Sequence, residues 1–184
     1  MTSKRVLKLL LPLFALLIFS PLAVAKEVHY GVYYGLFPAG EIKIDFAPQR
    51  VVVKGKSGGL LGLFYKYRLY LVYDVVNPAS SFMVEEENGK KRRFDYKKLL
   101  EKKAWLPVVI RILLHRGDIK EGQILRVGEY RVIPRSVNGK NYYFLVEGSK
   151  KTKAIALKGW RKNSFPERIE IETSSGTIIL QRED

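Results

Sequence analysis

The sequence has no cysteine and only two histidines, His29 and His115. The absence of cysteine excludes disulfide bonds, thiol nucleophiles and a lipid-modified N-terminal cysteine, so packing and hydrogen bonds must stabilise the fold alone. Two histidines far apart in the chain, without thiols or spaced carboxylates, do not form a ligand set for zinc. We therefore expect neither a metal site nor a cofactor.

Short catalytic motifs are also scarce. The segment GKSGG, residues 55–59, has the spacing of a hydrolase nucleophile elbow, but the only histidine after it, His115, lies in an apolar segment. The same segment resembles the end of a phosphate-binding loop, yet Arg50 occupies the place of the first glycine. We interpret residues 55–59 as a glycine-rich turn and expect no catalytic residue. A hydrolase with scattered carboxylates stays an alternative, because such sites have no short signature.

Acidic residues are absent from an apolar N-terminal stretch. Three cations precede an apolar run, residues 9–19, and the small residues Ala23-Val24-Ala25 follow it. This pattern is typical of a secretory signal peptide over residues 1–25, with cleavage after Ala25, and it predicts export to the periplasm. A retained membrane anchor is the alternative, but a span needs about 20 apolar residues, and Pro12 and Pro21 interrupt this stretch.

The rest of the chain, residues 26–184, has the length of one domain and is strongly basic. It holds 30 Lys and Arg against 18 Asp and Glu, a net charge of +12. This balance favours anionic partners or surfaces. The most basic window, residues 90–103, has eight cations and two acids; it fits an anionic membrane surface, but we favour a solvated face. Export makes nucleic acid an unexpected partner.

Alternation of apolar and polar residues dominates residues 26–184 and predicts one β-rich domain of about ten mostly antiparallel strands. We expect a mainly β fold, a curved antiparallel sheet or half-barrel with one apolar helix packed against it. The stretch 60–76 alternates as one long half-buried strand, kinked near Gly62. The other strands expected outside the hairpin at Asn88 cover residues 28–36, 41–46, 51–54, 130–136, 140–147, 167–173 and 177–182.

An Asn-Gly pair at Asn88-Gly89 predicts a two-residue hairpin turn. Opposite charges face each other on its first three rungs, so both faces of this tip are charged and we expect it to project into water. The pairs are Glu87 with Lys90, Glu86 with Lys91 and Glu85 with Arg92.

A second pair, Asn138-Gly139, predicts another hairpin. It places Ile133 opposite Phe144 and Val132 opposite Leu145. Apolar rungs on both faces predict a place in the middle of the sheet.

One segment has the features of a helix. Pro107 suits a first turn, His115 and Arg116 suit a last turn, and Gly117 follows as a stop. The β-branched residues of this segment leave a strand as the alternative. A helix so apolar must be buried on most sides.

The strand 28–36 has glycine at Gly31 and Gly35 on one face, which leaves space around Tyr33. Glycine weakens a strand, so this use indicates a sharp bend or the close approach of a helix or a ligand. We favour a helix over a ligand, and the segment 105–115 is the candidate.

Aromatic residues at alternating positions are our candidates for a ligand-binding wall. Period-two burial explains their spacing equally well without a ligand. The expected lining is Tyr33, Tyr65, Tyr67, Tyr73 and Trp105, and the expected contacts to anionic head groups are Lys90, Lys91, Arg92 and Arg93.

Three segments follow a known pattern in order: YYGLFPAGEIKI, then LPVVIRILLHRG with EGQILRV, then GWRKNSFPERIEIETSSGTIIL. Together they resemble the exported bacterial proteins of domain of unknown function family 3108, over nearly all of residues 26–184. The resemblance implies export to the envelope and a curved antiparallel sheet, similar to periplasmic lipoprotein carriers in which a sheet wraps a helix and holds acyl chains. The most typical pieces are Ala39-Gly40-Glu41, Trp160, Pro166 and Gly176.

Two functions fit these observations. The first is a non-enzymatic periplasmic binding or carrier module for an apolar or amphipathic ligand, such as an envelope lipid. The second is an envelope assembly or scaffold protein that binds a protein partner through an exposed strand edge or the charged hairpin.

Overall fold

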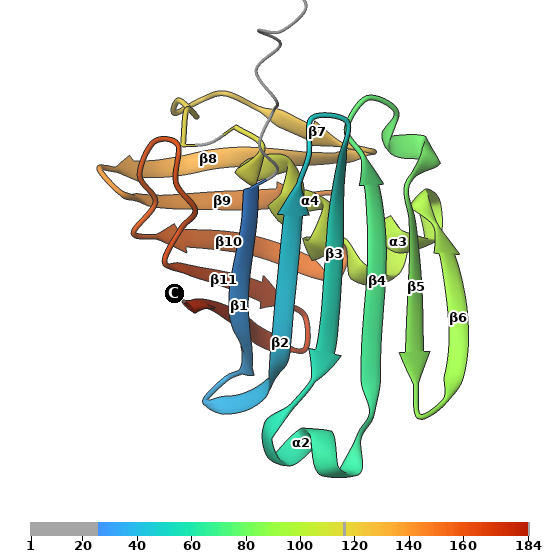
Figure 1. Ribbon diagram of the computed structural model, residues 1–184. Helices are drawn as coiled ribbons and strands as arrows, with labels where there is room; N and C mark the ends of the chain where they lie inside the picture. The colour runs from blue at the N-terminus through green and yellow to red at the C-terminus, as the bar shows by residue number, and fades with distance from the viewer. Residues whose placement is uncertain (1–25, 116, 184) are drawn as a thin grey trace, which may run out of the picture.

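The computed structural model describes residues 26–115 and 117–183, so the expected signal peptide and Arg116 lie outside the described residues. The described chain forms one sheet of twelve antiparallel strands with three helices and a short 3-10 turn (Figure 1). The mainly β, antiparallel class is confirmed, but the predicted ten strands and one helix were too few. Within the described residues, no helix has the length and apolar character needed to cross a membrane.

The first half of the sheet is a meander in which each strand pairs with the next along the chain. Helix α2, Gly59–Phe64, connects β3 to β4, and the 3-10 turn η1, Pro78–Ser80, connects β4 to β5. The strands are β1 (Lys26–Tyr34), β2 (Phe37–Phe46), β3 (Arg50–Ser57), β4 (Tyr67–Asp74), β5 (Phe82–Glu87) and β6 (Lys90–Asp95).

Two helices then carry the chain from one edge of the sheet to the other. Helix α3, Tyr96–Lys103, follows β6, and helix α4, Trp105–Leu113, leads towards β7 at the opposite edge. The later strands pair one after another until β12 meets β1 in the middle of the sheet. They are β7 (Leu125–Val127), β8 (Tyr130–Asn138), β9 (Asn141–Glu147), β10 (Thr152–Lys158), β11 (Arg168–Thr173) and β12 (Gly176–Glu183).

The sheet is open, because its edge strands β6 and β7 do not pair with each other in the described part of the chain. Figure 1 shows β1–β6 running vertically and β8–β11 running roughly horizontally. A twist of about 20° to 25° between neighbouring strands accumulates to such a change of direction. The sheet therefore twists strongly, but it does not curl into the half-barrel that we predicted.

Helix α4 lies in the core. Seven of its nine residues are buried, as expected for a helix that is apolar all round. Residues of both halves of the sheet form one cluster with it, including Tyr30, Leu71, Phe144 and Ile169. We call the face of β1–β6 that carries Tyr30 and Leu71 the inner face, and the opposite one the outer face.

The predicted long strand over residues 60–76 is wrong in its first part. Residues Gly59–Phe64 form helix α2, and only Tyr67–Asp74 form a strand. Gly59 has φ +59°, a left-handed conformation that glycine adopts without strain and that turns the chain out of β3. The glycines in this stretch therefore permit a compact turn where alternation alone predicted extended chain.

The two hairpin predictions differ in outcome. The register at Asn88-Gly89 is as predicted on all three charged rungs. At the second hairpin the two turn residues are Gly139 and Lys140, and a bulge between Pro134 and Ser136 shifts the register, so Ile133 pairs with Leu145 rather than Phe144. This hairpin also lies near the β7 edge rather than mid-sheet.

Among the described residues, no helix covers the glycine face of β1. A Cβ atom at Gly31 would lie 2.8 Å from the Glu183 carboxylate and 3.3 Å from the Tyr33 ring. Both side chains belong to the outer face, whereas α4 packs with Tyr30 on the inner face. The predicted close packing of the 105–115 segment against these glycines was therefore wrong.

Candidate ligand-binding site

An apolar cleft of about 240 Å³ opens on the inner face, at the end of the sheet where α2 lies. Strands β1 to β4 and β12 form its wall, and the end of α3 and the start of α4 cover it. We call it the inner-face cleft. Its lining residues are Val32, Ala39, Gly40, Glu41, Ile42, Gly55, Lys56, Ser57, Tyr65, Tyr67, Leu69, Lys103, Trp105, Leu106 and Ile178.

Small residues create the space in this cleft. A Cβ atom at Gly40 would lie 2.1 Å from the Lys56 carbonyl oxygen, so only glycine lets β2 and β3 approach so closely here. Gly55 faces Leu69, whose Cδ2 atom would lie 3.1 Å from an added Cβ. A side chain at either position would displace neighbouring groups or fill the cavity.

The Ser57 side chain links the end of β3 to the start of β4, on either side of α2. Its hydroxyl donates to the Tyr65 carbonyl oxygen at 2.7 Å and accepts from the Tyr67 amide at 2.9 Å. These two bonds hold Tyr65 and Tyr67 at the rim of the cleft. Ser57 is the last residue of β3, so the predicted turn over residues 55–59 is wrong in its first part. Both hydrogen-bonding roles of the serine are filled by backbone.

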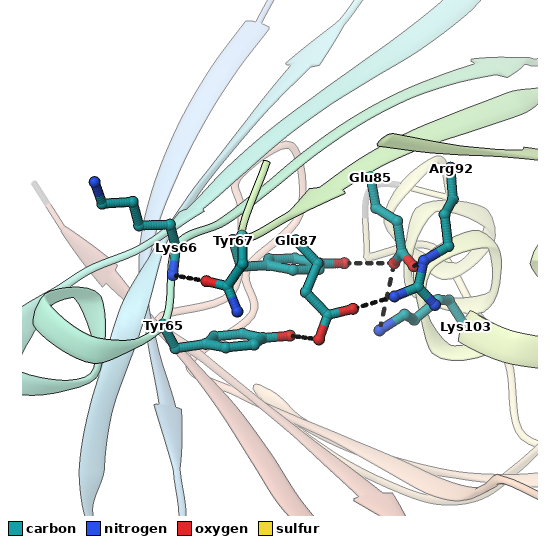
Figure 2. Close-up of polar contacts among 8 residues, drawn as sticks. Tyr65, Lys66, Tyr67, Glu85, Glu87, Arg92 and Lys103 are labelled. Carbon is teal, nitrogen blue, oxygen red and sulfur yellow. Dashed lines mark hydrogen bonds and ion pairs between the residues drawn. The ribbon is translucent and has the colours of Figure 1, made fainter. Parts of the chain in front are cut away.

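Two stacked phenols lead from the cleft to a charged cluster (Figure 2). The Tyr65 and Tyr67 rings are nearly parallel, with centroids 6.1 Å apart. The Tyr65 hydroxyl donates to Glu87 at 2.9 Å and the Tyr67 hydroxyl donates to Glu85 at 3.1 Å. We call this set, completed by Arg92 and Lys103, the tyrosine–glutamate cluster.

Glu85 is the centre of this cluster and is only 5% exposed. Arg92 and Lys103 each lie 3.9 Å from its carboxylate, and Arg92 also pairs with Glu87. A buried carboxylate needs such partners, because an isolated charge is costly to remove from water. The predicted fully solvated hairpin tip was therefore wrong on its inner face, which packs over Tyr67 and the end of α3.

Burial and the neighbouring carboxylates keep both phenols protonated. Burial, followed by the charge of Glu85, raises the pKa of Tyr67 above its ordinary value. Burial, followed by the hydrogen bond to Glu87, raises the pKa of Tyr65. Both hydroxyls thus act as hydrogen-bond donors and are fully used by the two glutamates.

Lys103 is the cation closest to the inner-face cleft in this cluster. Its ammonium group lies 5.4 Å from the centre of the Tyr67 ring, and its side chain is 36% exposed. Lys56 lines the same cleft but pairs with Glu41 at 2.9 Å. The cleft therefore joins an apolar interior to a border with two cations, each of which lies beside a carboxylate.

Three of the five residues predicted to line a ligand site meet here. Tyr65, Tyr67 and Trp105 line the inner-face cleft. Tyr73 instead is buried in the core, where its ring packs 6.4 Å from that of Tyr96. Tyr33 lies on the outer face, where its ring covers Gly31.

The four cations predicted to contact anionic head groups do not share a face. Arg92 pairs with carboxylates of the inner face, whereas Lys91 lies 3.8 Å from Glu86 on the outer face. The Arg93 guanidinium lies 4.0 Å above the Phe82 ring, and Lys90 is exposed beside the turn. Alternation along β6 divides this set, so it does not form one anion-binding patch.

The residues typical of the family pattern are held by structural contacts. The Trp160 indole donates to the Ser164 carbonyl oxygen at 3.2 Å and packs 5.0 Å from the Tyr142 ring. The Pro166 carbonyl oxygen accepts from the buried Tyr30 hydroxyl at 3.0 Å. At Gly176 a Cβ atom would lie 2.5 Å from the Tyr34 hydroxyl. Of this set, Ala39, Gly40 and Glu41 border the cleft.

Groups that could act chemically are dispersed. His29 lies on the outer face beside Glu27, 2.6 Å away, and His115 follows α4. No group of three or more histidine or acidic side chains suited to a metal ion occurs within residues 26–115 and 117–183. The arrangement offers binding surfaces and hydrogen-bond donors.

A larger hollow of about 490 Å³ lies on the outer face and is lined mainly by charged residues, among them Lys43, Lys54 and Arg68. Several of these charges are already paired, as in Lys43 with Glu27 at 2.5 Å. The inner-face cleft is smaller, but its apolar walls make it the stronger candidate site.

Comparisons with known proteins identify no family and only proteins described as uncharacterized or hypothetical. No family model matches the sequence. An uncharacterized protein of Aquifex aeolicus (strain VF5) is 29% identical over 146 residues, which are 79% of this chain and 80% of the relative. The hypothetical protein CT021 from Chlamydia trachomatis matches with a TM-score of 0.39 and 13% identity over 87% of each chain. The resemblance to family 3108 therefore stays a prediction.

Proposed function

We propose that this protein is a non-enzymatic binding module for an amphipathic ligand, whose apolar part occupies the inner-face cleft. The observation that supports it best is the meeting of Tyr65, Tyr67 and Trp105 around an apolar cavity in the sheet. Binding pockets for small molecules are typically concave and apolar, with a few polar groups that orient the ligand. In this proposal the ligand lies between the open, twisted sheet and the helices that cover it, and the cleft is the gap between them.

The dimensions of the cleft define the ligand class. Its volume of about 240 Å³ is below the range of about 300 to 1,000 Å³ typical of drug-sized ligands. It fits one acyl-chain segment rather than a whole two-chain lipid. Lys103 at its border favours an anionic head group, because its other charged contact, Glu85, is 3.9 Å away and leaves ammonium protons available.

We place this function in the periplasm. Residues 1–25 carry the cationic, apolar and small-residue regions of a signal peptide, which supports export and removal after Ala25. An envelope protein would meet single-chain amphiphiles at membrane surfaces. The same location fits the resemblance to family 3108.

The alternative scaffold function needs an available strand edge. The edge strand β7 has only three residues, and the other edge strand, β6, carries Lys90, Lys91, Arg92 and Arg93. Short strands and lysine-rich strands are devices that prevent edge-to-edge pairing. These edges favour the binding module over a scaffold that works by strand addition.

Trp105 allows a direct test of ligand binding. We would titrate the protein with dodecyl phosphate, a single-chain anionic amphiphile, below its micelle concentration and follow tryptophan emission. We expect a saturable blue shift with one ligand per chain, because the half-buried indole would exchange water for hydrocarbon. The signal should vanish in Trp105→Phe, since Trp160 is already 1% exposed in the core.

A matched pair of substitutions tests the place of binding. Ala39→Leu adds apolar volume inside the cleft, so we expect at least about tenfold weaker binding with unchanged or higher thermal stability. Ala79→Leu makes the same change on the exposed turn η1 and should bind as the wild type does. Equal affinity in the two variants, or no saturable binding in the wild type, would contradict the proposal.

A further inference from the structure

Five large apolar side chains are exposed together at one end of the molecule. They come from the β1–β2 turn, the first residue of β2 and α2, and each is 72% to 92% exposed. Figure 1 shows both segments at the lower end of the sheet, where α2 extends beyond the strands. We call this set the apolar tip; it consists of Leu36, Phe37, Leu60, Leu63 and Phe64.

Helix α2 turns its apolar side away from the protein. Leu60, Leu63 and Phe64 are spaced i, i+3 and i+4, so they lie on one face of the helix, and all three are exposed. A surface helix normally packs such a stripe against the core. Soluble monomers rarely expose a contiguous apolar patch unless it contacts another molecule or a membrane.

The two segments of the tip are held in place by close backbone contacts. The Gly58 amide donates to the Ala39 carbonyl oxygen at 3.0 Å, and a Cβ atom at Gly59 would lie 3.4 Å from the Pro38 carbonyl oxygen. Pro38 follows Phe37 directly, so α2 and the β1–β2 turn form one surface. The exposure is therefore built into the fold.

Cations border the apolar tip. A hollow of about 630 Å³ beside Gly62 is lined by Lys56, Lys66 and Arg68, with Glu86 as its one acid. Lys66 and Arg68 make no ion pair within 4 Å in the part of the chain that the structure describes. Figure 2 shows the Lys66 side chain pointing away from the tyrosine–glutamate cluster.

We propose that the apolar tip docks on the surface of an anionic lipid bilayer, with its five side chains at the boundary of head groups and acyl chains. Convex, protruding apolar side chains flanked by cations suit insertion into lipid, and the cations would lie at the level of the phosphates. The net charge of +12 over residues 26–184 favours the same surface. This inference goes beyond ligand binding in the cleft and does not require it.

Vesicle flotation tests this docking. Wild type and variants, each as residues 26–184 without the apolar N-terminal stretch, would be mixed with vesicles of equal parts phosphatidylglycerol and phosphatidylethanolamine, or of phosphatidylcholine alone. We expect the wild type to float mainly with the anionic vesicles, and Leu63→Ser with Phe64→Ser to bind at least about tenfold more weakly. Val76→Ser is the matched control, because Val76 is 79% exposed at the other end of β4.

A second pair of variants tests the role of charge. Lys66→Gln with Arg68→Gln should weaken binding to anionic vesicles about fivefold per cation, and added salt should abolish this difference. Lys150→Gln with Lys151→Gln removes the same charge from the β9–β10 turn and should have a smaller effect. Equal effects of the two pairs would overturn the proposal, because they would indicate a response to net charge alone.

The same experiments would detect other binding partners of the apolar tip. If vesicle binding is unchanged by the substitutions in α2, or if the wild type instead forms dimers that Leu63→Ser with Phe64→Ser dissociates, bilayer docking is wrong. Ala39→Leu separates this inference from the proposed ligand binding. Docking should persist in that variant even where ligand binding in the cleft is lost.

Discussion

At the scale of single residues, the rim of the cleft depends on two phenols that carboxylates hold in place. Tyr65 and Tyr67 donate to Glu87 and Glu85, and the two stacked residues line the cleft. The glutamates are balanced in turn by Arg92 and Lys103. A rim held by several polar contacts stays open when the cleft is empty, which lowers the cost of binding.

His115 is a residue whose environment predicts a pH dependence of stability. Burial, followed by the positive charge of Arg111, lowers its pKa below the ordinary value of 6.5, although Asp118 opposes this shift. Below pH 6.5 the unfolded chain therefore binds a proton at this position more readily than the folded chain, so the free energy of unfolding should fall as pH drops from 7 to 5.

Urea denaturation at pH 7 and pH 5 measures this effect. We expect His115→Gln to lose less stability between the two values than the wild type, because glutamine does not titrate. A titration of the His115 ring by nuclear magnetic resonance gives the folded-state pKa independently. Parallel stability profiles for both proteins would show that another group carries the dependence.

At this scale, alternation in the sequence assigned the residues of β4 to the correct face of the sheet. Tyr67 and Leu69 share the inner parity of β4, and both line the cleft. Tyr73 shares that parity too, but it lies farther along the strand, where Tyr96 of α3 covers it. Alternation predicts which face of a strand a residue occupies, but not which other elements cover it at that point along the strand. Ile178 and Lys103 carried no local signal in the sequence that could connect them to this site.

At the scale of elements, close approach of β2 and β3 is the feature most sensitive to substitution. Gly40→Ala would place a Cβ atom 2.1 Å from the Lys56 carbonyl oxygen, so the two strands would have to separate. We expect a loss of about 3 kcal/mol in the free energy of unfolding, at the upper end of ordinary substitutions. Urea denaturation with an unchanged m-value would measure it.

Gly35→Ala is the control for this substitution. Gly35 has φ +60°, and an added Cβ atom would meet nothing within 4 Å. The cost should therefore be limited to the left-handed conformation, about 1 to 2 kcal/mol. If both variants lost the same stability, the close approach at Gly40 would not be the cause.

Element boundaries were predictable only where local chemistry decided them. The Asn88-Gly89 turn requires positive φ at both residues, φ 48° and φ 82°, and this geometry set the register of β5 and β6. In contrast, α3 buries only Leu99 along its length, so its apolar pattern was too sparse to predict a helix. Its start at Asp95, whose side chain accepts from the Lys98 amide at 2.8 Å, was the available signal.

At the scale of the whole molecule, the order of strands explains where the site lies. The chain forms β1 to β6 from the middle of the sheet to one edge and then continues through α3 and α4 to the other edge. From there it forms β7 to β12, and β12 pairs with β1. This return places β12, with Ile178, beside the start of the chain and brings α4 against the inner face. Contacts between such distant segments follow from the global pairing, which alternation in a single sequence does not specify.

The inner-face cleft and the apolar tip lie at the same end of this sheet. Ala39 lines the cleft two residues after Phe37 of the tip, and Ser57 lines it three residues before Leu60. If the tip docks on a bilayer, the cleft lies close to the head groups. The two proposals then describe one path by which a single-chain amphiphile passes between membrane and protein.

The central claim is that the cleft holds the apolar part of an amphiphile in the cell envelope. Native mass spectrometry of the protein recovered from the periplasm without detergent tests it most directly. We predict a chain that starts at Lys26 with one bound small mass, which is retained in Ala79→Leu and lost in Ala39→Leu. A ligand-free mass for the wild type, or a bound mass that both variants retain equally, would contradict the account.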